Sequence, residues 1–166
     1  MIYNPNVYKF IQPVKEMRAV IQRVTTAKVV IDDIVRAEIQ HGFLVFLGIE
    51  TEDTQDDAKW LADKIKHMRI MNDEEGKMNL TLSDINGDVL VVSQFTLHAS
   101  TKKGNRPSYI GAARPDKAIP LYNFFNEQLE VLTGKEIATG IFGADMKVSL
   151  TNDGPVTIII DSRNRE

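Results

Sequence analysis

The segment GFLVFLGI at residues 42–49 decides the fold class of this chain. From Phe43 to Ile49 it is apolar without alternation, which is typical of a strand buried on both faces of a sheet. Downstream, Thr54 and Asp57 have capping-box spacing, and apolar residues at helical spacing predict a helix from about Asp56 to Arg69. A buried strand followed by an amphipathic helix indicates an α/β domain.

The residues before this strand predict a β-hairpin. Arg18 to Val24 alternate in a strand-like pattern. The apolar stretches at Ala27 to Ile31 and Ile34 to Ile39 flank Asp32-Asp33, a pair that favours a turn. Before them, residues 1–16 are polar and aromatic, contain two prolines and follow no sustained period, so we expect an N-terminal extension there.

Downstream of the predicted helix, the pattern favours a second hairpin. A strand is expected near Lys77 to Leu82, and a longer strand from Asp88 to Leu97. Asn86-Gly87 lies just before the longer strand and is a frequent hairpin turn. We therefore expect these two strands to pair with each other.

The C-terminal half predicts a second helix and two more strands. Pro115 suits the first helical turn, apolar residues continue at helical spacing to Leu132, and Gly134 is placed to end the helix. The strands are expected at Met146 to Leu150 and at Val156 to Ile160.

Length and composition favour one globular domain and exclude several classes of protein. The chain has 166 residues and no internal repeat, so we expect a single compact α/β domain at residues 17–166, with mixed β-sheets and two principal helices. The absence of cysteine excludes disulfides and cysteine nucleophiles. No apolar run approaches the roughly 20 residues of a spanning helix and no secretory signal is visible, so a cytoplasmic protein is expected. A net charge of −3 argues against a surface that coats nucleic acid broadly but allows a local basic patch.

Most familiar catalytic signatures are missing. The sequence contains no phosphate-binding loop, dinucleotide-binding glycine motif, nucleophile elbow or His-Glu-x-x-His zinc motif. The three histidines, His41, His67 and His98, lack the spacing of metal ligands, so no metal site is expected.

One candidate functional segment is Ser93-Gln94-Phe95-Thr96-Leu97, which follows the strongly apolar residues 89–92. Strand ends in α/β sheets are places where side chains and free backbone N–H groups converge on ligands. The same residues would also suit a strand that runs out into solvent, since Phe and Thr favour β structure.

Two further segments have both a functional and an ordinary interpretation. Residues 152–157 contain Gly154-Pro155, which suits a simple β-turn or, with a cis bond, a purposeful backbone geometry. Lys102, Lys103 and Arg106 lie in a polar loop at residues 100–114. Such a basic loop is usually solvated, but it is also the best local candidate for contact with a phosphate backbone.

Together these segments resemble the D-aminoacyl-tRNA deacylase family, in the class that carries a Ser-Gln-Phe-Thr motif and a Gly-Pro motif. The resemblance extends from Met17 to about Asp161 and also rests on residues 17–24, 75–80, 104–108 and 142–146. Each segment is weak evidence alone, but their number and order along the chain make coincidence improbable.

The resemblance implies a homodimer without cofactor or metal. It would hydrolyse the ester that joins a D-amino acid, or glycine, to the 3′-terminal adenosine of tRNA. Gly154 and Pro155, joined by a cis bond, would act in the partner's site, where their carbonyls hold the substrate's amino group and exclude an L side chain. Backbone N–H groups around Gln94, Phe95 and Thr96 would stabilise the developing oxyanion, and Ser93 with Gln94 would fix the adenosine and the carbonyl.

The remaining site residues have roles that the resemblance suggests or leaves open. Thr96 is either the nucleophile or a positioning group, and the lack of an evident base beside it favours assistance by the substrate's 2′-hydroxyl. Arg23 would brace the Gly-Pro segment. Phe142 and Met146 would line the pocket, although a surface arginine and two core side chains would also explain these three residues.

Two other functions stay open at this point. One is a non-catalytic RNA-binding module that uses Lys102, Lys103 and Arg106. The other is a general esterase that acts on small molecules through Thr96.

Overall fold

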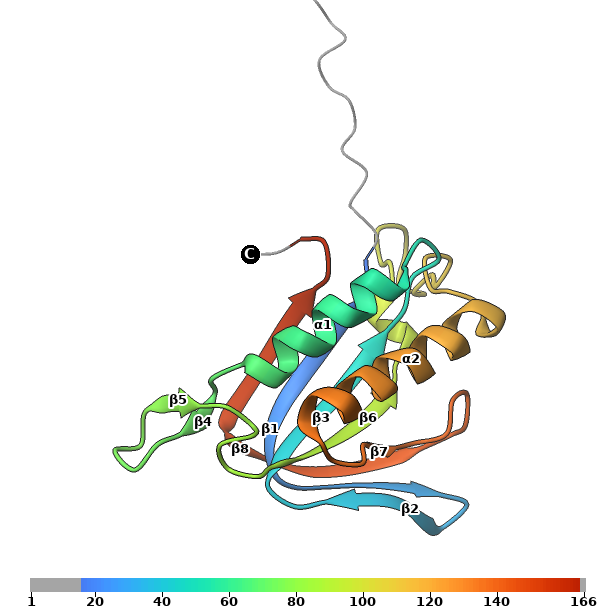
Figure 1. The fold of residues 1–166 in the computed structure, drawn as a ribbon. Helices are drawn as coiled ribbons and strands as arrows, with labels where there is room; N and C mark the ends of the chain where they lie inside the picture. Colours follow the sequence, from blue (N-terminus) through green and yellow to red (C-terminus); the bar gives the residue numbers. More distant parts are fainter. Residues whose placement is uncertain (1–15, 165–166) are drawn as a thin grey trace, which may run out of the picture.

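The computed structural model describes residues 16–164, which form a mixed β-sheet with two helices on one face (Figure 1). The expected N-terminal extension lies outside the described residues except for Glu16, which is buried. Within residues 16–164, no helix is long and apolar enough to cross a membrane.

The long strand β1 (Arg18–Ile31) organises the sheet because it pairs with three other strands, all antiparallel. Its first half pairs with β3 (Gly42–Gly48) and its second half with β2 (Ile34–Ile39). Its other edge pairs with β8 (Lys147–Asp161). The predicted hairpin turn between β1 and β2 is confirmed, and both aspartates in it have positive φ angles.

The predicted pairing of residues 77–82 with residues 88–97 is wrong. Strand β6 (Asp88–Ser93) instead lies parallel to β3 and to the short β7 (Ala138–Thr139). The exposed β5 (Met78–Leu80) pairs with β4 (Met71–Asn72) in a separate two-stranded sheet. Because residues 89–92 are all buried, they belong inside the main sheet, and an exposed two-stranded hairpin could not cover both of their faces.

Both predicted helices are present and pack on the same face of the sheet (Figure 1). Helix α1 (Gln55–His67) starts with the predicted capping box, in which the Thr54 N–H and hydroxyl both donate to Asp57 Oδ2 at 2.9 Å. Helix α2 (Pro115–Thr133) ends at Gly134, whose φ of 69° is the left-handed conformation that glycine adopts readily. Their buried side chains form the larger apolar core with the sheet.

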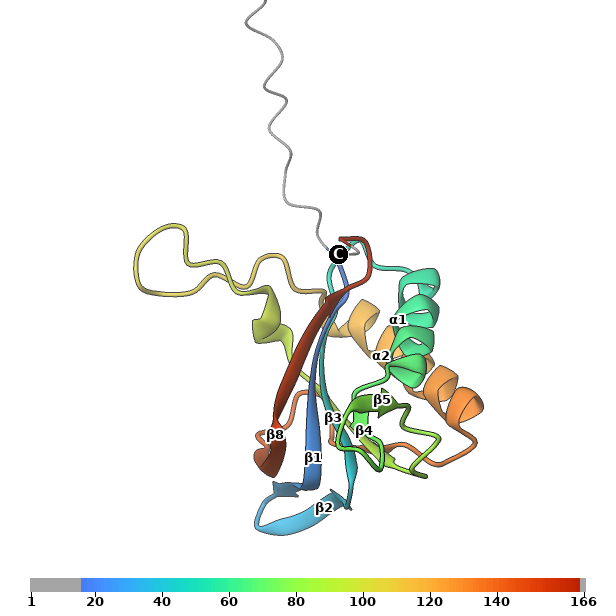
Figure 2. The same cartoon turned by 90° about the vertical axis from the view of Figure 1, so that its left-hand side faces the viewer.

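A second apolar cluster fills the opposite face of the sheet, where Val29, Leu44 and Leu90 are buried. The outer part of the sheet curls over it, so that β2 contacts β6 and β7. Strand β8 is continuous where two strands were expected, because register shifts opposite residues 22–26 of β1 absorb the Gly-Pro segment. Figure 2 shows the loop at residues 100–114 projecting on the side of the sheet away from the helices.

Candidate active site

The candidate site begins where β6 ends. Ser93 is the last residue of β6 and pairs with Leu47 of β3. The Gln94 N–H then donates to the Leu47 carbonyl at 2.8 Å, and the chain turns into the short 3₁₀ helix η1 (Phe95–His98). The first hydrogen bond of this turn runs from the Leu97 N–H to the Gln94 carbonyl at 3.2 Å, so the Phe95 and Thr96 amides precede the internal ladder. The predicted strand to Leu97 is therefore four residues shorter in the structure.

A cavity of about 560 Å³ opens beside this turn. It lies between the end of β6, the start of α2 and the segment that leads into β8. Of the predicted site residues, the cavity gathers Ser93, Gln94, Phe95, Phe142 and Met146. This volume is in the range of cavities that hold small organic ligands.

Thr96 is half-buried next to the cavity, and its hydroxyl accepts a hydrogen bond from the Gln94 side-chain amide. Within residues 16–164, no carboxylate or imidazole hydrogen-bonds the Thr96 hydroxyl. The nearby His98 ring packs against Gly48, where its buried Nε2 has no hydrogen-bond partner. The geometry thus shows no general base in contact with the threonine.

The Gly154-Pro155 bond is cis, and both residues are exposed. Neither residue is among those that line the cavity of their own chain. The adjoining part of β8 pairs with residues 22–24 of β1, whereas Ser93 lies on β6. Two strands, β1 and β3, separate β8 from β6, and three strand spacings correspond to about 14 Å.

Arg23 joins the Gly-Pro segment to the body of the domain. Its side chain is buried, with Nε donating to the Asp153 carbonyl at 3.0 Å and pairing with the Asp153 carboxylate at 3.1 Å. Its Nη1 donates to the Ile70 carbonyl and to Asn72 Oδ1 at 2.8 and 2.9 Å. Gly154 has φ of 128°, and a Cβ built on it would lie 3.1 Å from Arg23 Nη2. The interpretation of Arg23 as an ordinary surface arginine is therefore wrong.

The three basic residues of the loop do not line the cavity. Lys102, Lys103 and Arg106 are exposed at its tip. The base of the loop is closed by two hydrogen bonds between Ser100 and Ser108, of 2.8 and 2.9 Å. Above this closure the loop projects from the sheet on the side away from the helices (Figure 2).

Sequence reasoning missed Tyr109, which lines the cavity from the end of the loop. Tyr109 directly follows the Gly104 to Ser108 segment that carried part of the resemblance, and an aromatic residue at that point was the available signal. Arg114 also lines the cavity, from the start of α2. The sequence indicates Arg114 only as a further cation beyond the basic loop residues, because its place depends on how the loop meets the helix.

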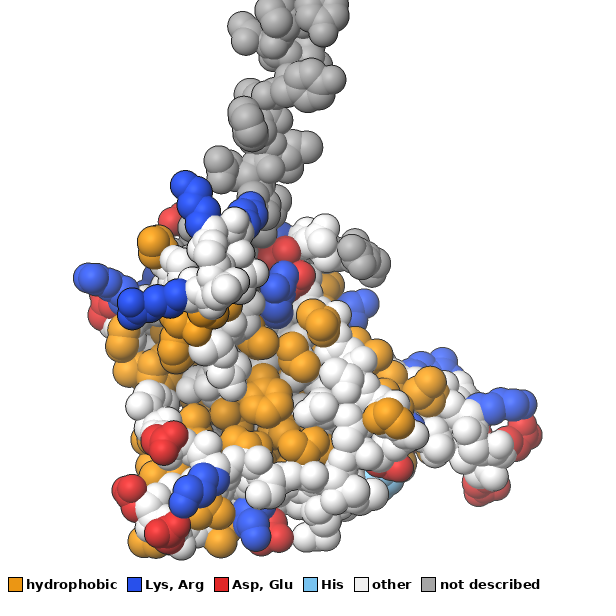
Figure 3. Space-filling view, turned by 180° about the vertical axis from the view of Figure 1, so that it is seen from behind, with side chains coloured by type: hydrophobic (Ala, Val, Ile, Leu, Met, Phe, Trp, Pro, Cys, Tyr) orange, Lys and Arg blue, Asp and Glu red, His pale blue; other side chains and the backbone are white. Residues whose placement is uncertain are grey.

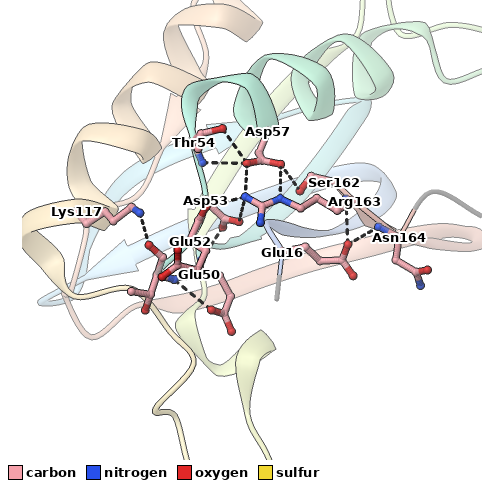
Figure 4. A network of polar contacts seen from close by, with 11 residues as sticks. Glu16, Glu50, Glu52, Asp53, Thr54, Asp57, Lys117, Ser162, Arg163 and Asn164 are labelled. Atoms are coloured by element: carbon pink, nitrogen blue, oxygen red, sulfur yellow. Dashed lines mark hydrogen bonds and ion pairs between the residues drawn. The ribbon is translucent and has the colours of Figure 1, made fainter. Parts of the chain in front are cut away.

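A polar network joins the start of α1 to the end of the described chain (Figure 4). The Asp57 carboxylate accepts from the Ser162 hydroxyl at 3.0 Å and from Arg163 at 3.0 and 2.7 Å. Burial opposes ionisation of Asp57, but these bonds and those from Thr54 hold its pKa well below its usual range. The end of the described chain is thereby fastened to the start of α1.

Asp53 lies in the same network, but its pKa is shifted in the opposite direction. Its Oδ2 accepts from the Glu50 N–H at 2.6 Å, while the buried Oδ1 has no hydrogen bond. Burial raises the pKa of Asp53 to about 7. Its neighbours hold the cavity wall, because Glu50 pairs with Ala112 and the Ala113 N–H donates to the Ile49 carbonyl at 2.8 Å.

No group of three or more His, Asp or Glu residues within residues 16–164 is arranged to hold a metal ion. What the arrangement offers chemically is backbone amides at the turn, the polar side chains of residues 93, 94 and 96, and an apolar cavity wall. Such sites stabilise negative charge on a substrate oxygen through fixed N–H donors.

The chain is similar to known proteins in sequence and in fold. A family described as D-Tyr-tRNA(Tyr) deacylase matches residues 20–161. The chain is 61% identical to a D-aminoacyl-tRNA deacylase of Flavobacterium johnsoniae, over 90% of this chain and all of that protein. A D-aminoacyl-tRNA deacylase of Phocaeicola vulgatus is 57% identical over the same shares of both chains.

Two solved structures are similar to this one. The first, named c-Myc DNA Unwinding Element Binding Protein, is 40% identical, with a TM-score of 0.81 over 86% of this chain and 97% of the other. The second, a probable eukaryotic D-amino acid tRNA deacylase, has a TM-score of 0.77 over 87% of this chain and 98% of the other. At 17% identity, the second shows a shared fold alone.

Proposed function

This chain belongs to the D-Tyr-tRNA(Tyr) deacylase family, and from that premise we propose a specific mechanism for its reaction. The chain is a hydrolase of the ester between a D-amino acid and the 3′-terminal adenosine of tRNA. Its product is free tRNA, ready for correct charging. The observation that carries the mechanism is the end of β6, where Ser93, Gln94 and Phe95 enter a cavity of about 560 Å³.

The chemistry rests on the turn after β6. The Phe95 and Thr96 amides precede the first internal hydrogen bond of η1, so they are available to an oxyanion that forms on the ester carbonyl. Ser93 and Gln94 hold the adenosine and the carbonyl. Removal of one such oxyanion donor typically costs about 3 to 4 kcal/mol of transition-state stabilisation.

Thr96 positions the substrate and does not attack it. Its hydroxyl accepts from Gln94, and no described carboxylate or imidazole is in place to remove its proton. The neighbouring 2′-hydroxyl of the substrate ribose assists the attack of water on the ester carbonyl. Thr96→Ala should therefore retain a measurable share of activity, whereas a nucleophilic threonine would leave none.

Selection against L-amino acids comes from Gly154 and Pro155 of a second copy of the chain. Both residues are exposed and neither lines the cavity of its own chain, so we assign them to the cavity of a second copy, which they reach across a dimer interface. Figure 3 shows hydrophobic side chains gathered on the face opposite the helices. Phe46, Val148 and Leu150 are half-buried and pack on the second core. Such a surface favours association of two copies.

The basic residues Lys102, Lys103 and Arg106 contact the tRNA backbone. Their exposure at the tip of a loop beside the cavity supports this role. The enzyme uses no metal or cofactor, and its substrates include glycyl-tRNA because the filter reads the α-carbon. We place it in the cytoplasm, where charged tRNA is used.

The function is tested by measuring the release of radiolabelled amino acid from D-tyrosyl-tRNA and L-tyrosyl-tRNA. The two substrates are compared side by side, with excess chelator present. Rapid release from the D ester alone is expected. Equal release from both esters would leave a hydrolase without the Gly-Pro filter. Release from neither would favour a binding module for nucleic acid, a function that the name of one solved relative suggests.

Mixing two variants tests the shared site. Gly154→Ala places a Cβ within 2.8 Å of Val156, distorts the Gly-Pro segment and should hydrolyse both esters, whereas Gln94→Ala removes the carbonyl-holding side chain and should be inactive. Refolded together in equal amounts, they form heterodimers in which one site combines an intact Gln94 with the partner's intact Gly-Pro segment. The release from the L ester relative to the D ester should then fall to about half of its value in Gly154→Ala alone. If each site were built within one chain, this ratio would not change on mixing.

A further inference from the structure

Two exposed aromatic rings stand together at the mouth of the cavity. Phe95 is 55% exposed and Tyr109 is 40% exposed. Their ring centroids are 5.1 Å apart and their planes meet at 74°, which is the favourable edge-to-face arrangement. Both residues line the cavity, so each ring presents apolar surface to whatever enters or leaves it.

The protein backbone fixes both rings in place without burying them. Phe95 starts the η1 turn, whose position is set by the Gln94 N–H bond to Leu47 at 2.8 Å. Tyr109 directly follows the closure between Ser100 and Ser108, and its carbonyl accepts from the Ala112 N–H at 3.0 Å. Rings held in advance lose little conformational freedom when a ligand stacks on them.

Positive charge surrounds the aromatic pair. Lys102, Lys103 and Arg106 are exposed on the same loop as Tyr109, and Arg114 lines the cavity beside it. Figure 3 shows Lys and Arg side chains gathered at the loop end of this face, next to hydrophobic surface. Asp145 is the one carboxylate among the described residues that line the cavity. Exposed aromatic faces flanked by cations are the combination that binds single-stranded nucleic acid.

We propose that Phe95 and Tyr109 form a stacking platform for the nucleotide that precedes the terminal adenosine of the tRNA 3′ end. This inference rests on the proposed function, because it assumes that the ester lies at the η1 turn. With the terminal nucleoside inside the cavity, the RNA strand must leave past the rim. The rim on the side of the basic loop is the aromatic pair, so the penultimate base meets the rings and its phosphate meets the loop.

Two substrates of different length separate stacking from catalysis. One is D-tyrosyl-adenosine, which ends at the terminal nucleoside, and the other is the D-tyrosylated trinucleotide CCA. In the wild type, the platform raises kcat/KM for the trinucleotide relative to the nucleoside. Tyr109→Ala should lower this ratio about 5- to 150-fold, mainly through KM, which is the effect of losing one base–aromatic stack.

Tyr109→Phe keeps the ring and should keep the ratio. Ile110→Ala is the matched control, since Ile110 is 88% exposed on the same loop and does not line the cavity. Equal losses on both substrates in Tyr109→Ala would overturn the platform and make Tyr109 a wall of the cavity. An unchanged ratio would overturn it as well.

Binding of the uncharged trinucleotide CCA distinguishes failure of this inference from failure of the proposed function. If the wild type hydrolysed neither substrate, the proposed function would fall. Weaker binding of CCA by Tyr109→Ala than by Tyr109→Phe would still support the platform. Equal binding by the two variants would refute it.

Discussion

The sharpest prediction concerns Asp53, whose buried carboxyl favours its neutral form. Its pKa rises from 3.8 to about 7 because burial opposes the charge. Between these two values the folded protein keeps a proton that the unfolded chain releases. The free energy of unfolding must therefore fall as the pH rises through this window, and the loss is complete above the folded pKa.

The size of the effect follows from the shift. Each pH unit within the window costs about 1.36 kcal/mol. Between pH 5 and pH 8, Asp53 should remove roughly 2.5 kcal/mol of stability from the wild type. In Asp53→Asn, the amide oxygen can still accept from the Glu50 N–H, and the side chain does not titrate. The variant should thus become the more stable protein at pH 8.

Urea denaturation at pH 5, 6, 7 and 8, at one fixed protomer concentration, measures this difference. Asp56→Asn is the matched control, because Asp56 is exposed in the first turn of α1 and the same charge is removed. The free energy of unfolding of the control should differ from that of the wild type by the same amount at every pH from 5 to 8. If Asp53→Asn and the wild type also ran parallel from pH 5 to pH 8, the argument from burial would be refuted.

Three further predictions concern stability. Asp57→Asn should reduce the loss of stability in acid. The wild-type carboxylate, with its lowered pKa, stabilises the fold above pH 3.8, and this stabilisation is lost as the pH falls further. Urea midpoints measured from pH 5 to pH 2.5 check this prediction. Tyr122→Phe removes the 2.8 Å bond to the buried Val91 carbonyl and should cost about 1 kcal/mol in urea denaturation, whereas no change would mean that the bond adds nothing. Gly134→Ala should lower the free energy of unfolding by about 1 kcal/mol through the φ of 69° alone, since a Cβ there meets no atom within 4 Å. Gly134→Asn should lower it less in the same urea denaturation.

Much of the local structure could be predicted because it depends on neighbours in sequence. The capping box at Thr54, the glycine that ends α2 and the turn after β1 each depend on residues within a few positions. The strand that ends near Ser93 could be predicted for the same reason. Its last four expected residues could not, because η1 depends on the hydrogen bond from Gln94 to Leu47, a residue far away in sequence.

Only some of the residues of the candidate site could be predicted from the sequence. The motif at residues 93–97 and the Gly-Pro segment were found from the order of residues alone. Phe142 and Met146 line the same cavity as Ser93, and their role toward the substrate stays a prediction. Tyr109 was missed because its exposure beside Phe95 results from the loop closure between Ser100 and Ser108.

The sequence by itself determined the two helices and the turn after β1, because periodicity and caps are local properties. Its motifs also predicted a set of site residues. The tertiary structure alone decided that β6 lies between β3 and β7, because four consecutive apolar residues can be buried only by strands on both sides and layers on both faces. It alone also left Gly154 outside the lining of its own cavity and buried Asp53, whose Oδ1 faces Arg163 at 3.8 Å without a hydrogen bond. Distances between strands and the loss of water around a carboxyl arise only when remote segments pack together.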